Sequence, residues 1–429
     1  MNRLISKSVS ALAAGVLLTG SMAAMPASAD LAFAADSSVG YSVGAFTDKQ
    51  PEVSDSYKST AKYVKISWEK VTGASGYRVY RKADGKGKYK AVAELSGKNT
   101  VTYKDTDVTP GTQYAYKIKA YKGTSSKQYS KSSKAVQTVA APDKVEEITK
   151  VWGKGDIAKL KWGKQDSADG YVVYYNYEGK WKKAAVIDSA DTVTARIDLR
   201  KLSLSYYDYS LGTQFCVKSY AADAKGGIKT AAASKTDLYC NMEQMSEYYA
   251  DGLKLLAKVS KGDSKTTFTN ENAQPKKSTK SKGSMTANDL KAVKKFAKSH
   301  FRSSWSDEQK VLYTLAWINR NNTYDTEYKH IRPGYAESIF EGRWGQCAQY
   351  NGALIEVMSY LGYDATLIQG FRGYDVKEGK QHFWGEVKVG SKKYVMETGN
   401  FGKNGGWSYF CTSYKYAGGY IKNQKVVTK

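Results

Sequence analysis

The chain has 429 residues, 35 tyrosines, six prolines and a formal net charge of +25. This length allows roughly two to four domains, and a tyrosine-rich, proline-poor composition is typical of ordered β-rich domains and excludes a disordered stalk. Four cysteines are too few for a disulfide-dense scaffold. The basic residues are scattered along the chain instead of forming one arginine-rich stripe, which argues against nucleic acid as a partner.

Residues 1–29 predict a secretory signal segment. Arg3 and Lys7 supply its charged start, a short apolar run follows, and small residues precede a cleavage site before Asp30. The apolar run is too short to span a bilayer. We therefore expect an exported protein without a transmembrane segment, secreted or held at the cell surface, with a flexible lead-in at 30–50. In that location, the basic surface would make anionic cell-wall polymers a candidate partner.

The chain repeats one pattern between residues 51 and 240. Short alternating runs are separated by turn residues, at the spacing of an antiparallel sandwich. Trp68 precedes a Gly-Tyr pair by eight residues, and Trp162 does the same. The Gly-Thr-Gln-Tyr run at 111–114 returns as Gly-Thr-Gln-Phe at 212–215. A repeat of about a hundred residues is a whole domain and not a solenoid unit.

These shared positions resemble fibronectin type III domains. The resemblance implies two all-β immunoglobulin-like sandwiches in tandem, at 51–140 and 141–240, which serve as spacers or binding modules. Neither copy contains a histidine, and no residue in them is expected to be catalytic.

Two cysteines fall at the end of the second copy. Cys216 is predicted on its penultimate strand and Cys240 just past its last strand. If the hairpin between them turns at Gly226-Gly227, Cys216 lies opposite residue 237, about three residues short of Cys240. A bulge or an offset would let a disulfide close, so the bonded and the reduced state are both left open.

The composition and the hydrophobic periodicity of the chain change after residue 240. Residues 241–283 predict a short amphipathic helix, at about 241–256, followed by a Lys/Ser/Thr-rich linker. Over 284–429, helical periodicity comes first and alternation of period two comes afterwards, which is typical of an α+β domain.

Gly345-Gln346-Cys347 stands at a predicted helix start within this last domain. Apolar residues recur at three- and four-residue steps after the cysteine, so one face of the helix is predicted to be buried. In a first helical turn, unpaired N–H groups and the positive end of the dipole stabilise a thiolate. Cys347 is therefore a candidate nucleophile, and a buried structural thiol is the alternative.

The chain has three histidines. His382 opens a predicted strand 35 residues after Cys347, and Glu397 closes the next strand of the same predicted hairpin. The start of one hairpin strand lies beside the end of the other, so this imidazole and this carboxylate are expected to be neighbours. Such a carboxylate fixes the tautomer of the imidazole and stabilises its cation. His300 and His330 are predicted to be surface residues.

Four short sequence blocks occur together in the last domain, and their order and spacing indicate a family. They are the Gly-Gln-Cys helix start, the run at 362–365, the His-Phe-Trp-Gly-Glu-Val block at 382–387 and the Tyr-Val-Met-Glu block at 394–397. In this order and spacing they resemble the transglutaminase-like superfamily. The expected architecture is therefore multidomain: two sandwiches followed by an α+β, papain-like, transglutaminase-type domain.

The same resemblance implies a Cys-His-Asp triad. Carried over, Cys347 is the nucleophile, His382 the general base and Glu397 the residue at the aspartate position. Glu397 departs from the family by one methylene, so Asn400 stays open as the residue that orients His382.

Further site residues follow from their place near the triad. The backbone N–H of Cys347 is expected to hold the oxyanion, with Gln346 as a candidate second donor. Trp344, Trp384 and Trp407 are candidates to line an acyl groove, and core filling is the alternative.

These residues predict a cysteine-dependent acyl-transfer enzyme that acts on amide bonds of protein or peptide substrates at the cell surface. Water would resolve the Cys347 thioester in a peptidase or amidase, and an amine would resolve it in a transglutaminase. Resemblance to bacterial members favours hydrolysis. No cofactor or metal site is expected, with calcium left open. The alternative is a non-catalytic surface-binding or adhesive protein that uses the sandwiches and the basic surface.

Overall fold

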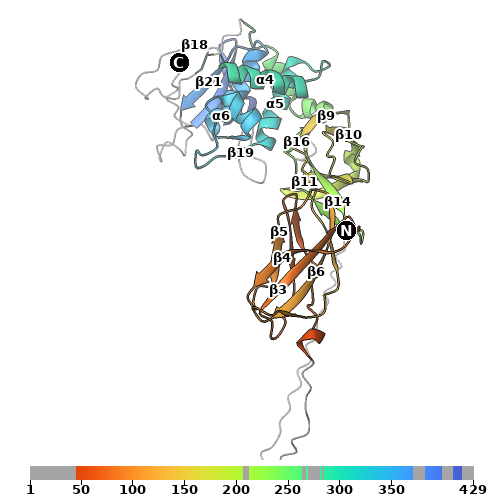
Figure 1. Ribbon diagram of the computed structural model, residues 1–429. Coiled ribbons are helices and arrows are strands. Elements are labelled where there is room, and N and C mark those ends of the chain that lie inside the picture. Colours follow the sequence, from red (N-terminus) through yellow and green to blue (C-terminus); the bar gives the residue numbers. More distant parts are fainter. Residues whose placement is uncertain are drawn as a thin grey trace, which may run out of the picture. The chain divides into compact units, whose positions relative to one another are not determined.

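The computed structural model describes residues 45–205, 212–262, 285–370, 382–398 and 409–417, together with the backbone of two short strands at 267–268 and 281–282. The expected signal segment and most of the lead-in lie outside the described residues. Figure 1 shows strands at the N-terminal side of the chain and mixed helices and strands after them.

The first sandwich has two antiparallel sheets. One sheet has the order β1-β2-β5; in the other the order is β4-β3-β6-β7, and β8 also pairs with β6. A 3₁₀ turn precedes them. The elements are η1 (Phe46–Asp48), β1 (Lys58–Thr60), β2 (Tyr63–Ser67), β3 (Gly76–Ala83), β4 (Lys90–Ser96), β5 (Thr102–Asp105), β6 (Gln113–Lys122), β7 (Gln128–Tyr129) and β8 (Val136–Val139).

The second sandwich repeats this topology, with sheets β13-β10-β9 and β12-β11-β14-β15 and with β16 paired to β14. Its elements are β9 (Ile148–Lys154), β10 (Ile157–Trp162), β11 (Gly170–Tyr177), β12 (Lys180–Ile187), β13 (Thr194–Asp198), η2 (Leu199–Lys201), β14 (Thr213–Ala222), β15 (Ile228–Thr230) and β16 (Asp237–Tyr239).

The repeated tryptophan and tyrosine hold equivalent places in the two cores. The rings of Trp68 and Tyr77 lie 5.4 Å apart between centroids, and those of Trp162 and Tyr171 lie 5.3 Å apart. Each tyrosine hydroxyl also accepts a backbone N–H from the loop before its own strand. The sequence repeat therefore reflects one packing solution used twice.

The repeated glutamine does something different: it reaches out of its own sandwich. Gln113 Nε2 donates to the carbonyl of Ala222 in the second sandwich, at 3.0 Å. Gln214 Nε2 donates to the carbonyl of Arg320, at 2.7 Å, beyond the second sandwich. The same sequence position thus contacts the following module in both copies.

The C-terminal domain combines helices with a sheet of order β18-β17-β21-β22-β23-β24, in which the β17–β21 pairing is parallel and the others are antiparallel. Its helical elements are α2 (Met242–Tyr248), α3 (Ala250–Leu256), α4 (Ala287–His300), α5 (Asp307–Asn321), the π-helical turn η3 (Glu337–Gly342), α6 (Cys347–Tyr360) and α8 (Tyr414–Ala417). Its strands are β17 (Thr267–Phe268), β18 (Ser281–Lys282), β19 (Thr323–Tyr324), β20 (Trp344–Gly345), β21 (Ala365–Gly370), β22 (His382–Val389), β23 (Lys392–Glu397) and β24 (Tyr409–Ser413).

The segment at 241–283, predicted to be one helix and a linker, differs from that prediction in the structure. Two short helices, α2 and α3, replace the single helix, and Met245 and Leu256 are buried in the same apolar core as α4, α5 and α6. Strands β17 and β18 lie inside the Lys/Ser/Thr-rich stretch and join the C-terminal sheet. Composition predicted a linker there because strands of two residues, held by backbone pairing, leave no hydrophobic pattern in the sequence.

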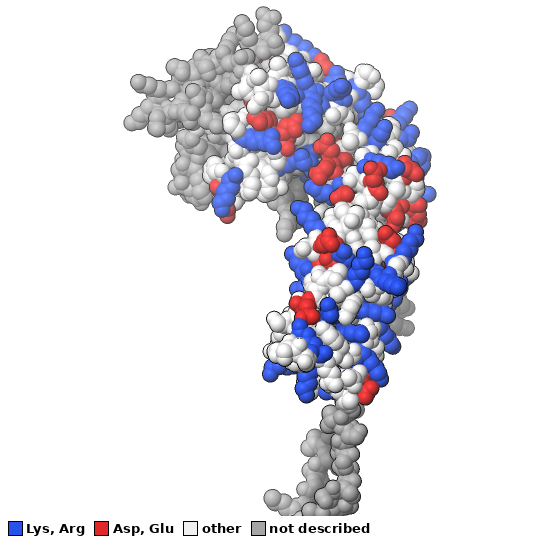
Figure 2. All heavy atoms as spheres, in the orientation of Figure 1, with Lys and Arg blue, Asp and Glu red and all other residues white. Residues whose placement is uncertain are grey.

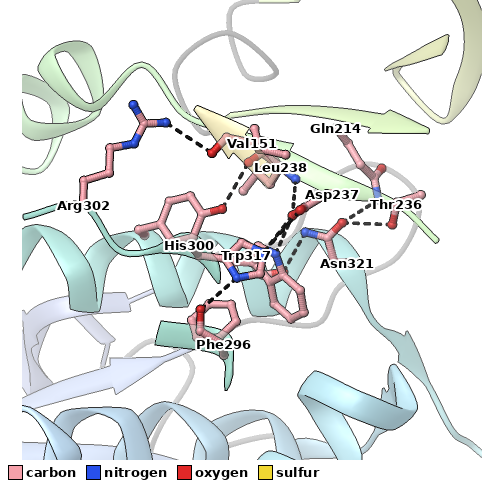
Figure 3. A network of polar contacts seen from close by, with 11 residues as sticks. Val151, Gln214, Thr236, Asp237, Leu238, Phe296, His300, Arg302, Trp317 and Asn321 are labelled. Carbon is pink, nitrogen blue, oxygen red and sulfur yellow. Dashed lines mark hydrogen bonds and ion pairs between the residues drawn. The ribbon is translucent and has the colours of Figure 1, made fainter. Parts of the chain in front are cut away.

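The second sandwich also enters that core. Leu238 and Cys240, at and just after β16, pack in the cluster formed by the helices of the C-terminal domain. Next to them Asp237 is 3% exposed and accepts from Trp317 Nε1 at 2.9 Å, while both of its oxygens lie 3.2 Å from His300 Nε2 (Figure 3). The prediction that His300 is a surface residue is therefore wrong, because its partner lies 63 residues earlier in the chain.

The disulfide left open between Cys216 and Cys240 is not formed, and none of the four cysteines is part of a disulfide in the described part of the chain. β14 pairs with β16 so that Phe215 faces Asp237, and the chain enters the other core at Cys240. Burial raises the pKa of Cys216 and of Cys240 to about 12. Cys411 is a buried thiol on β24. Among the described helices, none has both the length and the apolar character needed to cross a bilayer.

Candidate active site

Cys347 is the first residue of α6, after the two-residue strand β20. The backbone N–H of Gln346 donates to Gln349 Oε1 at 3.1 Å, which fixes the entry to the helix. Gly345 has to be glycine, because an added Cβ would come within 2.7 Å of Gln349 and 2.8 Å of Ile339. The thiol is partly exposed, while most of α6 behind it is buried. The thiol is thus presented at the edge of a rigid core.

His382 and Glu397 are neighbours, as the predicted hairpin required. β22 pairs with β23 in the register Gly385 to Met396, which brings the start of one strand beside the end of the other. His382 Nε2 lies 2.8 Å from Glu397 Oε1, and both side chains are buried. The longer glutamate therefore reaches the imidazole without a change in strand pairing.

The thiol and the imidazole are hydrogen-bonded and change each other's protonation. Burial works to raise the pKa of Cys347, but the hydrogen bond and charge of His382 outweigh it, with further bonds from the Phe383 N–H and the Tyr324 hydroxyl, and the pKa is lowered. Burial works to lower the pKa of His382, but its bonds to Cys347 and Glu397 raise it instead. Both shifts favour a thiolate–imidazolium pair.

Asn351 locks these three residues together. It lies one turn after Cys347 on α6 and is almost fully buried. Its Nδ2 donates to the carbonyl of Phe383 at 2.8 Å and to that of Cys347 at 3.1 Å. Its Oδ1 accepts the N–H of Thr398 at 2.9 Å. One side chain thereby ties the cysteine helix to the residues that follow His382 and Glu397 directly.

Sequence reasoning missed Tyr324. This tyrosine ends β19, which pairs in parallel with β20 so that Tyr324 faces Gly345. Its hydroxyl hydrogen-bonds both the side chain and the backbone of Cys347. Burial and then the charge of Cys347 raise its pKa, so the hydroxyl keeps its proton. A tyrosine 23 residues upstream carries no motif of its own, and only the parallel β19–β20 pair reveals it.

Several predicted site residues have other contacts. Gln346 Nε2 donates to the carbonyl of Asp325 at 2.6 Å, so this amide is engaged away from the thiol. Trp384 is fully buried and donates to the Tyr414 hydroxyl at 2.8 Å. It fills a core and does not line an open groove. Trp344 is partly buried and stacks on His330 at 4.3 Å between ring centroids. Asn400 and Trp407 lie outside the described residues.

A metal centre is not apparent in the part of the chain that the structure describes, since no group of three or more His, Cys, Asp or Glu side chains is placed to hold an ion there. The carboxylate of Glu397 is committed to His382. The chemistry that this arrangement supports is that of an activated thiol.

Comparison with known proteins gives one family and several structures. Residues 294–410 match the Transglutaminase-like superfamily. No curated protein matches the chain. Among solved structures, the chicken CNTN1 FN1-FN3 domains are 20% identical, with 46% of this chain and 68% of that chain covered and a TM-score of 0.27. A two fibronectin type III domain segment from chicken tenascin is 17% identical, with 45% and 98% covered and a TM-score of 0.25.

Those structural scores are too low to carry an argument, and the sandwich architecture rests on the strand pairing described above. The family match covers α5, α6 and strands β21 to β23, and it includes Cys347, His382 and Glu397. The chain therefore consists of all-β sandwich domains of fibronectin type III-like topology followed by a transglutaminase-like domain.

Proposed function

We propose that the chain is an exported, cysteine-dependent enzyme that cleaves amide bonds of protein or peptide substrates. The observation that carries the proposal is the continuous contact from the Cys347 thiol through His382 to Glu397. Cys347 is the nucleophile, His382 the general base and acid, and Glu397 the residue that orients His382.

The contacts support a two-step reaction. The Cys347 thiolate attacks the amide carbon, and the C=O bond opens to an oxyanion beside the Cys347 N–H and the Tyr324 hydroxyl. His382 gives its proton to the departing amine, and a thioester forms. His382 then takes a proton from water, the hydroxide attacks the thioester carbon, and the acid and the Cys347 thiolate are released. Tyr324 thus takes the place that sequence reasoning gave to Gln346.

Hydrolysis and cross-linking differ only in the second nucleophile. We favour water, because the Cys347 thiol is partly exposed and nothing in its described surroundings selects an amine. Peptide libraries incubated in ¹⁸O-water with an added primary amine separate the two outcomes by mass: hydrolysis adds ¹⁸O to the new acid, and transamidation adds the amine.

Iodoacetamide labelling at pH 6 tests the thiolate before any substrate is known. We expect Cys347 in the folded protein to react faster than a free thiol, and Cys347→Ala to abolish this labelling. Cys216 serves as the internal control, because its buried thiol has a raised pKa. A Cys347 that reacts no faster than a free thiol would overturn the proposal.

A second candidate is a surface-binding role, in which the sandwiches and the positive charge would hold the protein on a surface without catalysis. It is favoured by the net charge of +25 and by the Lys and Arg side chains that cover much of the face in Figure 2. Anionic cell-wall polymer is the partner that this charge would attract. In this case, Cys347→Ala would leave binding intact, and binding would weaken steeply with salt.

A further inference from the structure

A cavity of about 100 Å³ lies away from the cysteine, where the second sandwich meets α4 and α5. Both modules contribute to its wall. The lining includes Arg343, Trp317, His300, Asp237, Lys235 and Lys295.

The guanidinium of Arg343 is the unusual group in this lining. Its Nε and Nη1 atoms are buried and have no hydrogen-bond partner among the described residues. Its Cζ lies 4.1 Å from the centre of the Trp317 ring, so the indole face holds the guanidinium in place. Burial lowers the pKa of Arg343, against the opposing charge of Asp237. Two buried N–H groups without a hydrogen-bond partner are costly, and an acceptor that reaches them removes that cost.

The carboxylates nearby already have other partners. Asp237 accepts from His300, from Trp317 and from the N–H of Leu238. Glu341 pairs with Lys295 at 3.2 Å. Glu147 is exposed and acts on Arg343 through its charge, and it bonds neither of the two buried nitrogens. The lining thus offers donors that its own acceptors do not satisfy.

We propose that this cavity is a binding site for a small oxyanion, a phosphate or a carboxylate group, held by the Arg343 guanidinium against the Trp317 ring. Arginine suits such groups because its fork of N–H donors matches their paired oxygens. Lys235, exposed beside the cavity, adds positive charge for a bound anion. The site is independent of the proposed chemistry at Cys347.

Titration of the full chain with inorganic phosphate and, separately, with acetate tests the proposal, with sodium chloride at equal ionic strength as the blank. We expect saturable binding by calorimetry and a shift of the Arg343 Nε–H resonance. Arg343→Gln should weaken binding about tenfold to a hundredfold. Arg196→Gln, which removes the same charge from an exposed position on β13, should bind as the wild type does.

The two anions distinguish the sources of the ligand. Tighter phosphate binding assigns the site to a phosphorylated molecule, and tighter acetate binding assigns it to a carboxylate end. The proposal is wrong if neither anion moves the Arg343 Nε–H resonance, or if Arg343→Gln binds both anions as well as Arg196→Gln does. Should Arg343→Gln fail to fold, the resonance of the wild-type protein still decides, with Arg343→Lys used for its assignment.

Discussion

Two histidine–carboxylate pairs in the described part of the chain, one buried and one partly buried, differ in what faces the other side of the ring. His382 contacts Glu397 through Nε2 and also hydrogen-bonds the Cys347 thiol. His300 contacts Asp237 through Nε2, and its Nδ1 lies 3.0 Å from the carbonyl of Phe296. The first ring lies between an acceptor and an ionisable thiol. The second lies between two acceptors.

This difference separates the pair that we propose to be catalytic from a structural one. His300 has an acceptor beside each ring nitrogen and no thiol to activate. His300 also stacks on Phe296, at 4.6 Å between centroids, and so is packed against the core (Figure 3). A buried imidazole beside a carboxylate is thus not a catalytic signature by itself; the third group decides its role.

Replacing His382 or His300 by alanine should give the largest effects, and the two variants should differ in whether reactivity or stability is lost. His382→Ala should lower iodoacetamide labelling of Cys347 at pH 6 and turnover of any substrate by about a thousandfold or more, because the thiolate loses its counter-ion and proton carrier. His300→Ala should leave labelling unchanged. It should lower the free energy of unfolding by about 3 kcal/mol, because Asp237 keeps a buried charge without its partner.

Chemical denaturation and labelling rates, measured on both variants, check this contrast. If His300→Ala, still folded, lost labelling as His382→Ala does, the structural reading of the second pair would be wrong.

The sequence led to one pair and not to the other for a physical reason. His382 and Glu397 lie 15 residues apart on a two-stranded hairpin, so local pairing rules bring them together. Asp237 and His300 meet across 63 residues through packing between modules, which no local pattern encodes. Tyr324 and Asn351 were missed as site residues on similar grounds: one depends on a parallel pairing of two-residue strands, and the other looks like an ordinary buried helix position.

The two networks each contain one buried asparagine, which allows a second matched test. Asn351→Ala should lower turnover about tenfold to a hundredfold and move the labelling inflection of Cys347 towards that of a free thiol, because His382 is no longer held against it. Asn321 accepts from Thr236 Oγ1 at 2.9 Å in the other network. Asn321→Ala should change only the stability, by about 1 kcal/mol. If the pH profile of Cys347 labelling were unchanged in Asn351→Ala, Asn351 would have a structural role only.

Two tyrosines sharpen the comparison further. Tyr324→Phe removes the hydroxyl beside Cys347 and should lower turnover about tenfold, through the loss of one hydrogen bond to the proposed oxyanion. Tyr313 donates to the carbonyl of Leu238 at 3.1 Å in the His300 network, so Tyr313→Phe should cost about 1 kcal/mol of stability and no activity. Steady-state turnover and thermal unfolding separate these results. Faster turnover in Tyr324→Phe would mean that the hydroxyl blocks the thiol instead of assisting it.

A pair of carboxyls without a histidine is expected to affect stability alone and to leave the reaction unchanged. Glu356 of α6 hydrogen-bonds Asp289 of α4 and accepts the N–H of Ala336 at 2.9 Å. Burial, and then the charge of Asp289, raise the pKa of Glu356 well above its ordinary value. Glu356 therefore keeps its proton where an ordinary glutamate would release it.

The sign of the pH dependence follows from that raised pKa. Below the ordinary glutamate value of about 4.3, Glu356 is protonated in the folded and the unfolded chain alike, and its contribution is fully present. As the pH rises, the unfolded chain releases the proton while the folded chain retains it, so the free energy of unfolding falls.

Glu356→Gln keeps a donor towards Asp289 and removes this loss of stability. It should match the wild type near pH 4 and gain on the order of 2 kcal/mol near pH 7, whereas Glu247→Gln, at an exposed position on α2, should change neither. Denaturant melts at both pH values check this, and an equal stability of Glu356→Gln and wild type near pH 7 would show that Glu356 is already ionised in the folded chain.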